Sequence, residues 1–141
     1  MTTRTVEDLL TGRPLVDVTG SFTVAAACHR MRERGVGALA VVEGRRLVGI
    51  LSERDVAVRV VAGHRDPMLT LVREVMTREP RTVQAHAGIP EALRAMLGGG
   101  YRHLPVMLGD AVVGMLSLRD IPPDWLAGGR DRPQAPVPAL G

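Results

Sequence analysis

The sequence predicts an α/β (α+β) fold in which two β-α-β-β-α repeats pack together as one pseudo-two-fold globule. The segment GILSERD at residues 49–55 returns as GMLSLRD at residues 114–120, an offset of 65 residues. Further pairs keep this offset without a gap: Gly35 and Gly100, Leu39 and Leu104, Val41 and Val106, Gly44 and Gly109, Val48 and Val113. A unit of this length is near the lower limit for burying a core alone, so the two copies gain stability by packing against each other.

The first elements of each repeat follow from local apolar patterns. Segments 15–19 and 81–84 predict an opening strand in each copy. A helix is then expected, with Ser21 as its N-cap in the first copy and Gly35 at its end. Its apolar stripe is Val24, Ala27, Cys28 and Met31, which the second copy repeats as Ile89, Ala92, Leu93 and Met96. Pro90 suits a first helical turn, and glycines 98–100 end the second helix.

The next elements are two hairpins and two closing helices. Strands at 39–42 and 47–51 flank a turn at Gly44, and strands at 104–108 and 112–116 flank a turn at Gly109. Valines after Asp55 favour a closing helix in the first copy. After Asp120, the prolines of Ile121-Pro122-Pro123 predict a short or displaced helix. We therefore expect a first repeat at 6–62, a linker at 63–71, a second repeat at 72–126 and a disordered tail at 127–141.

Composition favours a compact protein of the cytoplasm. No apolar run approaches the roughly 18 residues that span a bilayer, and the first eight residues lack the apolar segment of a signal peptide. All 18 basic residues are arginines, but they are scattered and the aromatic residues are only Phe22, Tyr101 and Trp125. These features disfavour nucleic-acid binding. The absence of asparagine, with abundant alanine, arginine, glycine, proline and valine, indicates a bacterial source.

The repeated Gly-x-x-Ser-x-Arg-Asp segment is the main candidate site. A serine hydroxyl at a helix N-terminus and a nearby arginine suit a phosphate. A carboxylate accepts hydrogen bonds from both ribose hydroxyls. The candidate residues are Ser52, Arg54 and Asp55 in the first copy and Ser117, Arg119 and Asp120 in the second. Ser-x-x-Asp is also a capping-box pattern, and for a single isolated copy the cap is the favoured interpretation.

The duplication in one framework resembles the CBS-domain family, over about residues 6–121. The matching motifs are the two Gly-h-h-Ser-x-x-Asp segments, the strand entrance YRHLPV at 101–106 and the repeat opening VREVMT at 72–77. The resemblance implies clefts that bind adenosine-containing ligands such as AMP, ATP, S-adenosylmethionine or NAD, and a homodimer. It also implies that Asp55 and Asp120 hold ribose and that Ser52 and Ser117 approach phosphate. The strand entrance at 101–106 has further implied roles. There, Arg102 and His103 contact phosphate, while Leu104 and Pro105 line the base.

The two clefts are expected to be unequal. Gly37 and Ala38 stand where the second copy has Arg102 and His103, so the first strand entrance lacks the basic pair. We therefore expect Arg102 and His103 to dominate phosphate recognition.

Neither catalysis nor metal binding is predicted. The four histidines are separated by 35, 22 and 17 residues, which matches no compact ligand spacing, so we expect them at the surface. No catalytic triad pattern is recognisable, and the lone Cys28 is expected to be a packed thiol. The leading hypothesis is a non-catalytic regulatory module that senses an adenosine ligand for an unknown client protein. Alternatives are a structural protein-interaction module without ligand and, less favoured, a nucleic-acid-binding protein.

Overall fold

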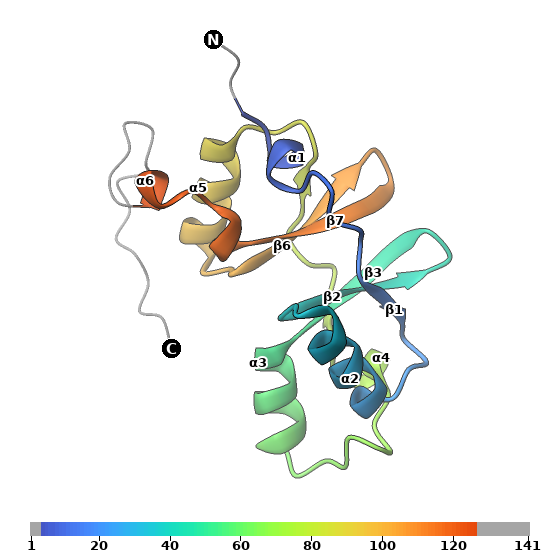
Figure 1. Ribbon diagram of the computed structural model, residues 1–141. Helices are drawn as coiled ribbons and strands as arrows, with labels where there is room; N and C mark the ends of the chain where they lie inside the picture. The colour runs from blue at the N-terminus through green and yellow to red at the C-terminus, as the bar shows by residue number, and fades with distance from the viewer. Residues whose placement is uncertain (1–3, 127–141) are drawn as a thin grey trace.

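The computed structural model describes residues 4–126 and contains two similar α/β units (Figure 1). The segment before residue 63 comprises α1 (Val6–Leu9), β1 (Asp17–Thr19), α2 (Val24–Arg34), β2 (Ala38–Glu43), β3 (Arg46–Ser52), α3 (Glu53–Asp55) and the π-helix η1 (Val56–Val61). The later segment comprises α4 (Val72–Val75), β4 (Thr77–Arg78), β5 (Val83–Gln84), α5 (Ile89–Gly99), β6 (His103–Leu108), β7 (Ala111–Ser117), the 3₁₀ helix η2 (Leu118–Asp120) and α6 (Pro123–Leu126). The predicted mixed α/β class is confirmed.

The two sheets repeat one pairing scheme. One sheet has the order β1-β2-β3-β4 and the other has the order β5-β6-β7. In each sheet the opening strand pairs parallel to the first hairpin strand, and the hairpin is antiparallel. Val41 faces Gly49 and Val106 faces Gly114, and in both hairpins the register shifts at the next residue. The two repeats therefore share even the register shift in their hairpins.

The long helices α2 and α5 form for the predicted reasons, with one correction at the N-terminus of α2. The N-cap is Thr23, whose hydroxyl accepts from the Ala26 N–H at 3.1 Å. Ser21, the expected cap, instead shares a 2.8 Å hydrogen bond with the Thr19 hydroxyl. Both helices end in the left-handed conformation, at Gly35 with φ of 65° and at Gly100 with φ of 70°. Glycine adopts this conformation without steric cost.

The opening segments of the two repeats are exchanged between the two cores. Val6 of α1 is fully buried in the core formed by β5, β6, β7 and α5, and its N–H donates to the Ala87 carbonyl at 2.9 Å. Val72 of α4 is fully buried in the other core, and its N–H donates to the Phe22 carbonyl at 2.9 Å. Strand β4 then pairs with β3. Figure 1 shows α1 beside the second unit and α4 beside the first. The sequence patterns did not predict α1, α4 or β4.

A small apolar layer joins the two sheets. Its buried members come from β2 and β7, and partly buried residues surround them: Ala40, Val42 and Val112, with Leu15, Leu47, Met107 and Met115. Strands β2 and β3 both contact β7. The two units therefore share a packed interface beyond the exchanged segments.

The closing helices differ as predicted. After Asp55 the chain continues through the π-helix η1, whereas after Asp120 it forms a single 3₁₀ turn followed by the short α6. Pro122 and Pro123 interrupt the backbone hydrogen bonding that would continue the helix. Within residues 4–126, no helix has the length and apolar character needed to cross a membrane. The expected tail at 127–141 lies outside the described residues.

Candidate functional site

In each repeat, the motif serine lies beside the strand entrance. Ser52 pairs with Ala38, and Ser117 pairs with His103, across the two hairpins. The residue after each serine donates its N–H to the strand entrance: Glu53 to the Gly37 carbonyl at 3.0 Å, and Leu118 to the Arg102 carbonyl at 2.9 Å. The fold therefore brings together the two sequence motifs that were predicted to form each site.

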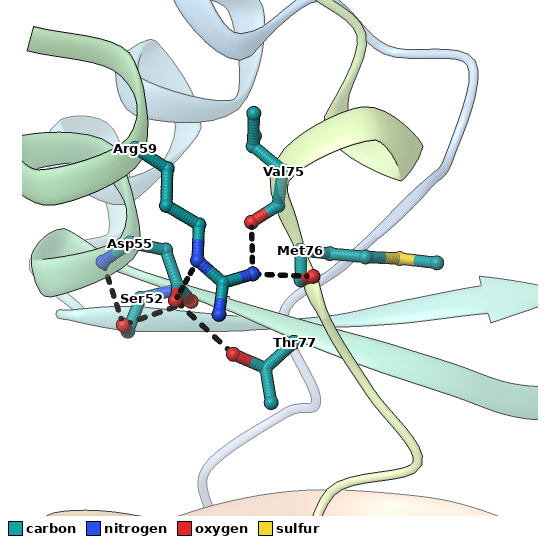
Figure 2. Close-up of polar contacts among 6 residues, drawn as sticks. All are labelled: Ser52, Asp55, Arg59, Val75, Met76 and Thr77. Carbon is teal, nitrogen blue, oxygen red and sulfur yellow. Dashed lines mark hydrogen bonds and ion pairs between the residues drawn. The ribbon is translucent and has the colours of Figure 1, made fainter. Parts of the chain in front are cut away.

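Asp55 is the buried acidic residue of a capping box, and its carboxylate accepts hydrogen bonds from several groups (Figure 2). Its Oδ2 accepts from the Ser52 N–H at 2.9 Å and from the Ser52 hydroxyl at 3.0 Å. Its Oδ1 accepts from the Thr77 hydroxyl at 3.1 Å. The Ser52 hydroxyl in turn accepts from the Asp55 N–H at 3.2 Å, which completes a capping box. The capping interpretation of this motif is therefore correct in the first repeat, and Thr77 adds a link to the second.

Arg59 ties the first closing helix to the opening of the second repeat. One guanidinium nitrogen donates to the Val75 and Met76 carbonyls, both at 3.0 Å, and Nε lies 3.9 Å from Asp55 Oδ1 (Figure 2). The two carbonyls lie at the C-terminal end of α4, where no further intrahelical donors are available. Sequence reasoning missed Arg59, because the two carbonyls to which it donates lie 16 and 17 residues away and no local pattern marks them.

Asp120 pairs with an arginine, whereas the equivalent Asp55 accepts from the Thr77 hydroxyl. Its Oδ2 accepts from the Ser117 N–H at 2.7 Å, and its Oδ1 pairs with Arg13 at 2.8 Å. The Asp120 side chain is 12% exposed and the Arg13 side chain is 50% exposed. The Ser117 hydroxyl accepts from the Arg119 N–H at 3.2 Å. Arg13, which was not predicted, therefore places the segment after α1 directly over the second motif.

The second strand entrance presents its side chains in different directions. Arg102 is exposed and His103 is partly buried, whereas Leu104 is fully buried in the core and Pro105 is buried. The side chain of Leu104 therefore packs in the protein interior. The prediction that all histidines are surface residues is wrong for His103, although His29, His64 and His86 are exposed.

The electrostatic surroundings of His103 favour its neutral form. Burial lowers the pKa of His103 below its usual range, and the neighbouring Arg102 lowers it further. The carboxylates of Glu53 and Asp120 act in the opposite direction, and Arg119 adds to the lowering. His103 therefore lies where charged groups from both repeats converge.

An open cleft of about 480 Å³ lies at this junction. Its walls come from α2, the first strand entrance, the start of the closing helix and one residue of the second repeat: Cys28, Met31, Arg32, Gly35, Val36, Gly37, Glu53, Val56 and Arg119. Of the predicted site residues, only Arg119 is among them. Cys28 packs against the first core as predicted, and burial raises the pKa of its thiol.

Gly37 leaves room for charged groups at the edge of this cleft. A side chain at this position would collide with the Glu53 carboxylate, and its first carbon would lie 3.5 Å from His103 Nε2. Glu53 and Gly37 were not singled out as site residues by the sequence motifs. Within residues 4–126, no cluster of three or more histidine, cysteine, aspartate or glutamate side chains could hold a metal ion.

Comparison with known proteins identifies relatives of this fold. A family model described as CBS domain matches residues 6–62 and 72–121. A CBS domain-containing protein of Arabidopsis thaliana, CBSCBSPB2, is 39% identical over 116 residues, which are 82% of this chain but 22% of that protein. The chain thus spans about a fifth of the length of this curated relative.

Solved structures agree in fold. A protein with CBS domains from Burkholderia ambifaria MC40-6 superposes with a TM-score of 0.79 at 32% identity, covering 94% of this chain and 100% of that chain. A CBS domain protein from Pyrobaculum aerophilum complexed with AMP has a TM-score of 0.76 at 26% identity, covering 83% of this chain and 89% of that chain. With matching motifs, family model and architecture, the chain belongs to the CBS-domain family.

Proposed function

We propose that this protein is a non-catalytic regulatory module that senses an adenosine-containing ligand in clefts between its repeats. The ligand classes considered are AMP, ATP, S-adenosylmethionine and NAD. The observation that carries the proposal is the open cleft, because residues of both repeats line it. The AMP complex of the Pyrobaculum aerophilum relative supports the same ligand chemistry.

The cleft offers complementary surfaces to the parts of a nucleoside ligand. Cys28, Met31, Val36 and Val56 supply apolar contact for a base, and Arg119 supplies a cation from the second repeat. A ligand that touches both repeats stabilises the relative packing for which it has the higher affinity. Occupancy can then be transmitted to a client protein or across a homodimer without any chemical step.

Apart from Arg119, the motif residues do not line this cleft, and the roles proposed for them are those expected from the sequence. Asp55 and Asp120 bind ribose beside their capping contacts, and Ser52, Arg54, Ser117 and Arg119 lie near phosphate. Arg102 and His103 contribute phosphate contacts in the second cleft, with Leu104 and Pro105 shaping its base side. No cofactor is required in this proposal, and the adenine nucleotide is the regulatory ligand.

Calorimetric titration tests the proposal directly. The full chain is titrated with AMP, ADP, ATP, S-adenosylmethionine and NAD, and small molecules released from the purified, denatured protein are identified by mass spectrometry. We expect at least one compound to give saturable heat and to raise the melting temperature, because a ligand that binds only the folded state stabilises it. No heat and no thermal shift with all five compounds at millimolar concentration contradicts the proposal.

A second candidate is a structural interaction module without ligand. It is favoured by the capping contacts, since the oxygens of Asp55 already accept from Ser52 and Thr77, and those of Asp120 from Ser117 and Arg13. Under this alternative the motif only stabilises the helix starts and the exchange of opening segments. The same titration separates the two functions.

A further inference from the structure

We propose that the short helix α6 is an internal gate on the second cleft, where Trp125 and Leu126 occupy the space that the first repeat leaves open for a base. This inference rests on the proposed function and names the regulation of one of its two sites. The occupant belongs to the chain itself, so a nucleotide that enters the second cleft must first displace α6.

The offset of 65 residues identifies the walls of the second cleft. Cys28 and Val56 line the open cleft and are partly exposed, and their counterparts are Leu93 and Ile121. Leu93 is fully buried and Ile121 is 2% exposed. Positions that form an open wall in the first repeat are therefore shielded from water in the second.

The rim of the second cleft also differs in chemistry. Arg32 and Glu53 line the open cleft and are exposed, whereas their counterparts are Leu97 and Leu118. Both leucines are partly buried and pack against the second core. Two charged positions are thus replaced by apolar ones, and an apolar rim gains stability from contact with another apolar side chain.

Helix α6 supplies apolar side chains beside this rim. Trp125 and Leu126 are partly buried and pack against the same core as the two leucines, and Figure 1 shows α6 next to α5. The Trp125 N–H donates to the Pro122 carbonyl at 3.0 Å, which closes a turn directly after the motif. In the first repeat the closing helix instead leaves Val58 56% exposed and Val61 70% exposed. The two repeats therefore use the residues after the motif differently.

The gate is weak enough for a ligand to displace it. Helix α6 is a single turn of four residues, and an isolated turn is not stable in water. Its position therefore depends on the packing of Trp125 and Leu126, and such a segment opens more readily than a core strand. The apparent affinity of the second cleft is reduced by the fraction of molecules in which α6 is displaced.

The test removes the large side chain of the gate in the full chain. In calorimetric titration, Trp125→Ala should bind AMP in the second cleft about tenfold more tightly than the wild type, because closure no longer lowers the apparent affinity. Asp124→Ala is the matched control, since Asp124 lies in the same turn but is exposed, and it should bind AMP as the wild type does. Trp125 is the only tryptophan of the chain. Its fluorescence in the wild type should therefore shift to longer wavelength when AMP displaces α6 into water.

The outcomes distinguish the gate from the function on which it rests. Circular dichroism first establishes that each variant is folded, and if Trp125→Ala is not, the fluorescence of the wild type decides. Equal AMP affinity and stoichiometry in the wild type and Trp125→Ala, an equal gain in Asp124→Ala, or unchanged fluorescence at saturating AMP overturns the gate. Heat from AMP binding to the wild type then leaves the sensing function standing. Absence of binding by every adenosine compound, to the wild type and to the variants, overturns both.

Discussion

Asp55 and Asp120 occupy equivalent motif positions but differ in the residue that holds Oδ1. Thr77 donates to Asp55, and Arg13 pairs with Asp120. A carboxylate offers about four acceptor positions, so ribose hydroxyls can add to these contacts. We expect 2′-deoxy-AMP to bind about 1–3 kcal/mol more weakly than AMP, because it leaves one acceptor unpaired. Titration calorimetry with the two nucleotides measures this difference, and equal affinities would remove the ribose role of both aspartates.

Arg102 is the residue expected to read phosphate in the second cleft. It is exposed, so Arg102→Ala should leave the fold intact and change ligand selectivity. We expect a loss of about 1.5 kcal/mol for AMP and ATP, at the lower end for a hydrogen bond to a charged group because water reaches the site. Adenosine affinity should not change. The comparison is made at two salt concentrations, with Arg81→Ala as an exposed control, and an equal loss for adenosine and ATP contradicts the phosphate role.

His103 should make stability depend on pH. Burial and the charge of Arg102 lower its pKa in the folded state, so the unfolded chain binds this proton more readily. The contribution of neutral His103 is therefore fully present above the unfolded pKa of about 6.5 and is lost as the pH falls toward the lower folded pKa. We expect the free energy of unfolding of the wild type, relative to His103→Gln, to fall between pH 8 and pH 5. Urea denaturation of both proteins gives this difference, and a difference that rises toward acid would show that Glu53 and Asp120 dominate.

At the scale of secondary-structure elements, the glycine of each motif makes room for the opening segment of the other repeat. A methyl group on Gly49 would lie 2.7 Å from Met76 Sδ and 2.8 Å from the Thr77 carbonyl oxygen, whereas one on Gly114 would lie 2.8 Å from the end of the Leu10 side chain. A backbone atom in a paired strand cannot move aside as a side-chain end can. We expect Gly49→Ala to cost about 1–3 kcal/mol of stability and Gly114→Ala less. Urea unfolding of the two variants provides the matched comparison, and equal costs would contradict this account.

Local patterns predicted the elements whose stabilising contacts are local. The helices α2 and α5 and both hairpins follow from apolar periodicity and turn glycines, and the structure confirms them. The cap of α2 was misplaced from Thr23 to Ser21, because both are hydroxyl residues near the helix start. Thr23 directly precedes Val24 and accepts from the Ala26 N–H, whereas the Ser21 hydroxyl pairs with Thr19. The elements α1, α4 and β4 were missed because their partners belong to the other repeat.

The candidate site shows the same difference: its local contacts were predicted and its contacts between repeats were not. The motif spacing predicted that Ser52 and Asp55 cap a helix, a contact that spans three residues. It could not predict that Arg13 pairs with Asp120 or that Arg59 donates to the Val75 and Met76 carbonyls, because these contacts depend on how the two repeats pack. The cleft likewise depends on that packing, since Glu53 and Arg119 come from different repeats. Contacts within a motif can thus be predicted from the sequence, whereas contacts between motifs can be identified only once the fold is known.

On the scale of the whole molecule, the exchanged opening segments make each half depend on the other. A chain divided after residue 67 would give one fragment that holds α1 without the core it completes, and another that holds α4 and β4 without theirs. We expect fragments 1–67 and 68–141 to be largely unfolded when separate, since each loses buried apolar surface, and to recover native circular dichroism when mixed. Size-exclusion chromatography of the mixture should show a one-to-one complex. A cooperative thermal transition in either fragment alone would contradict this dependence.

The exchange also gives the connecting segment at residues 63–71 a physical role beyond spanning a gap. If the halves recognise each other as separate fragments do, joining them turns a bimolecular association into an intramolecular step. The covalent connection then sets an effective concentration of one half around the other. Folding of the intact chain would be independent of protein concentration, whereas reassembly of the divided chain would slow with dilution. The same residues would therefore form one covalent folding unit or a complex of two fragments, according to whether a single peptide bond is intact.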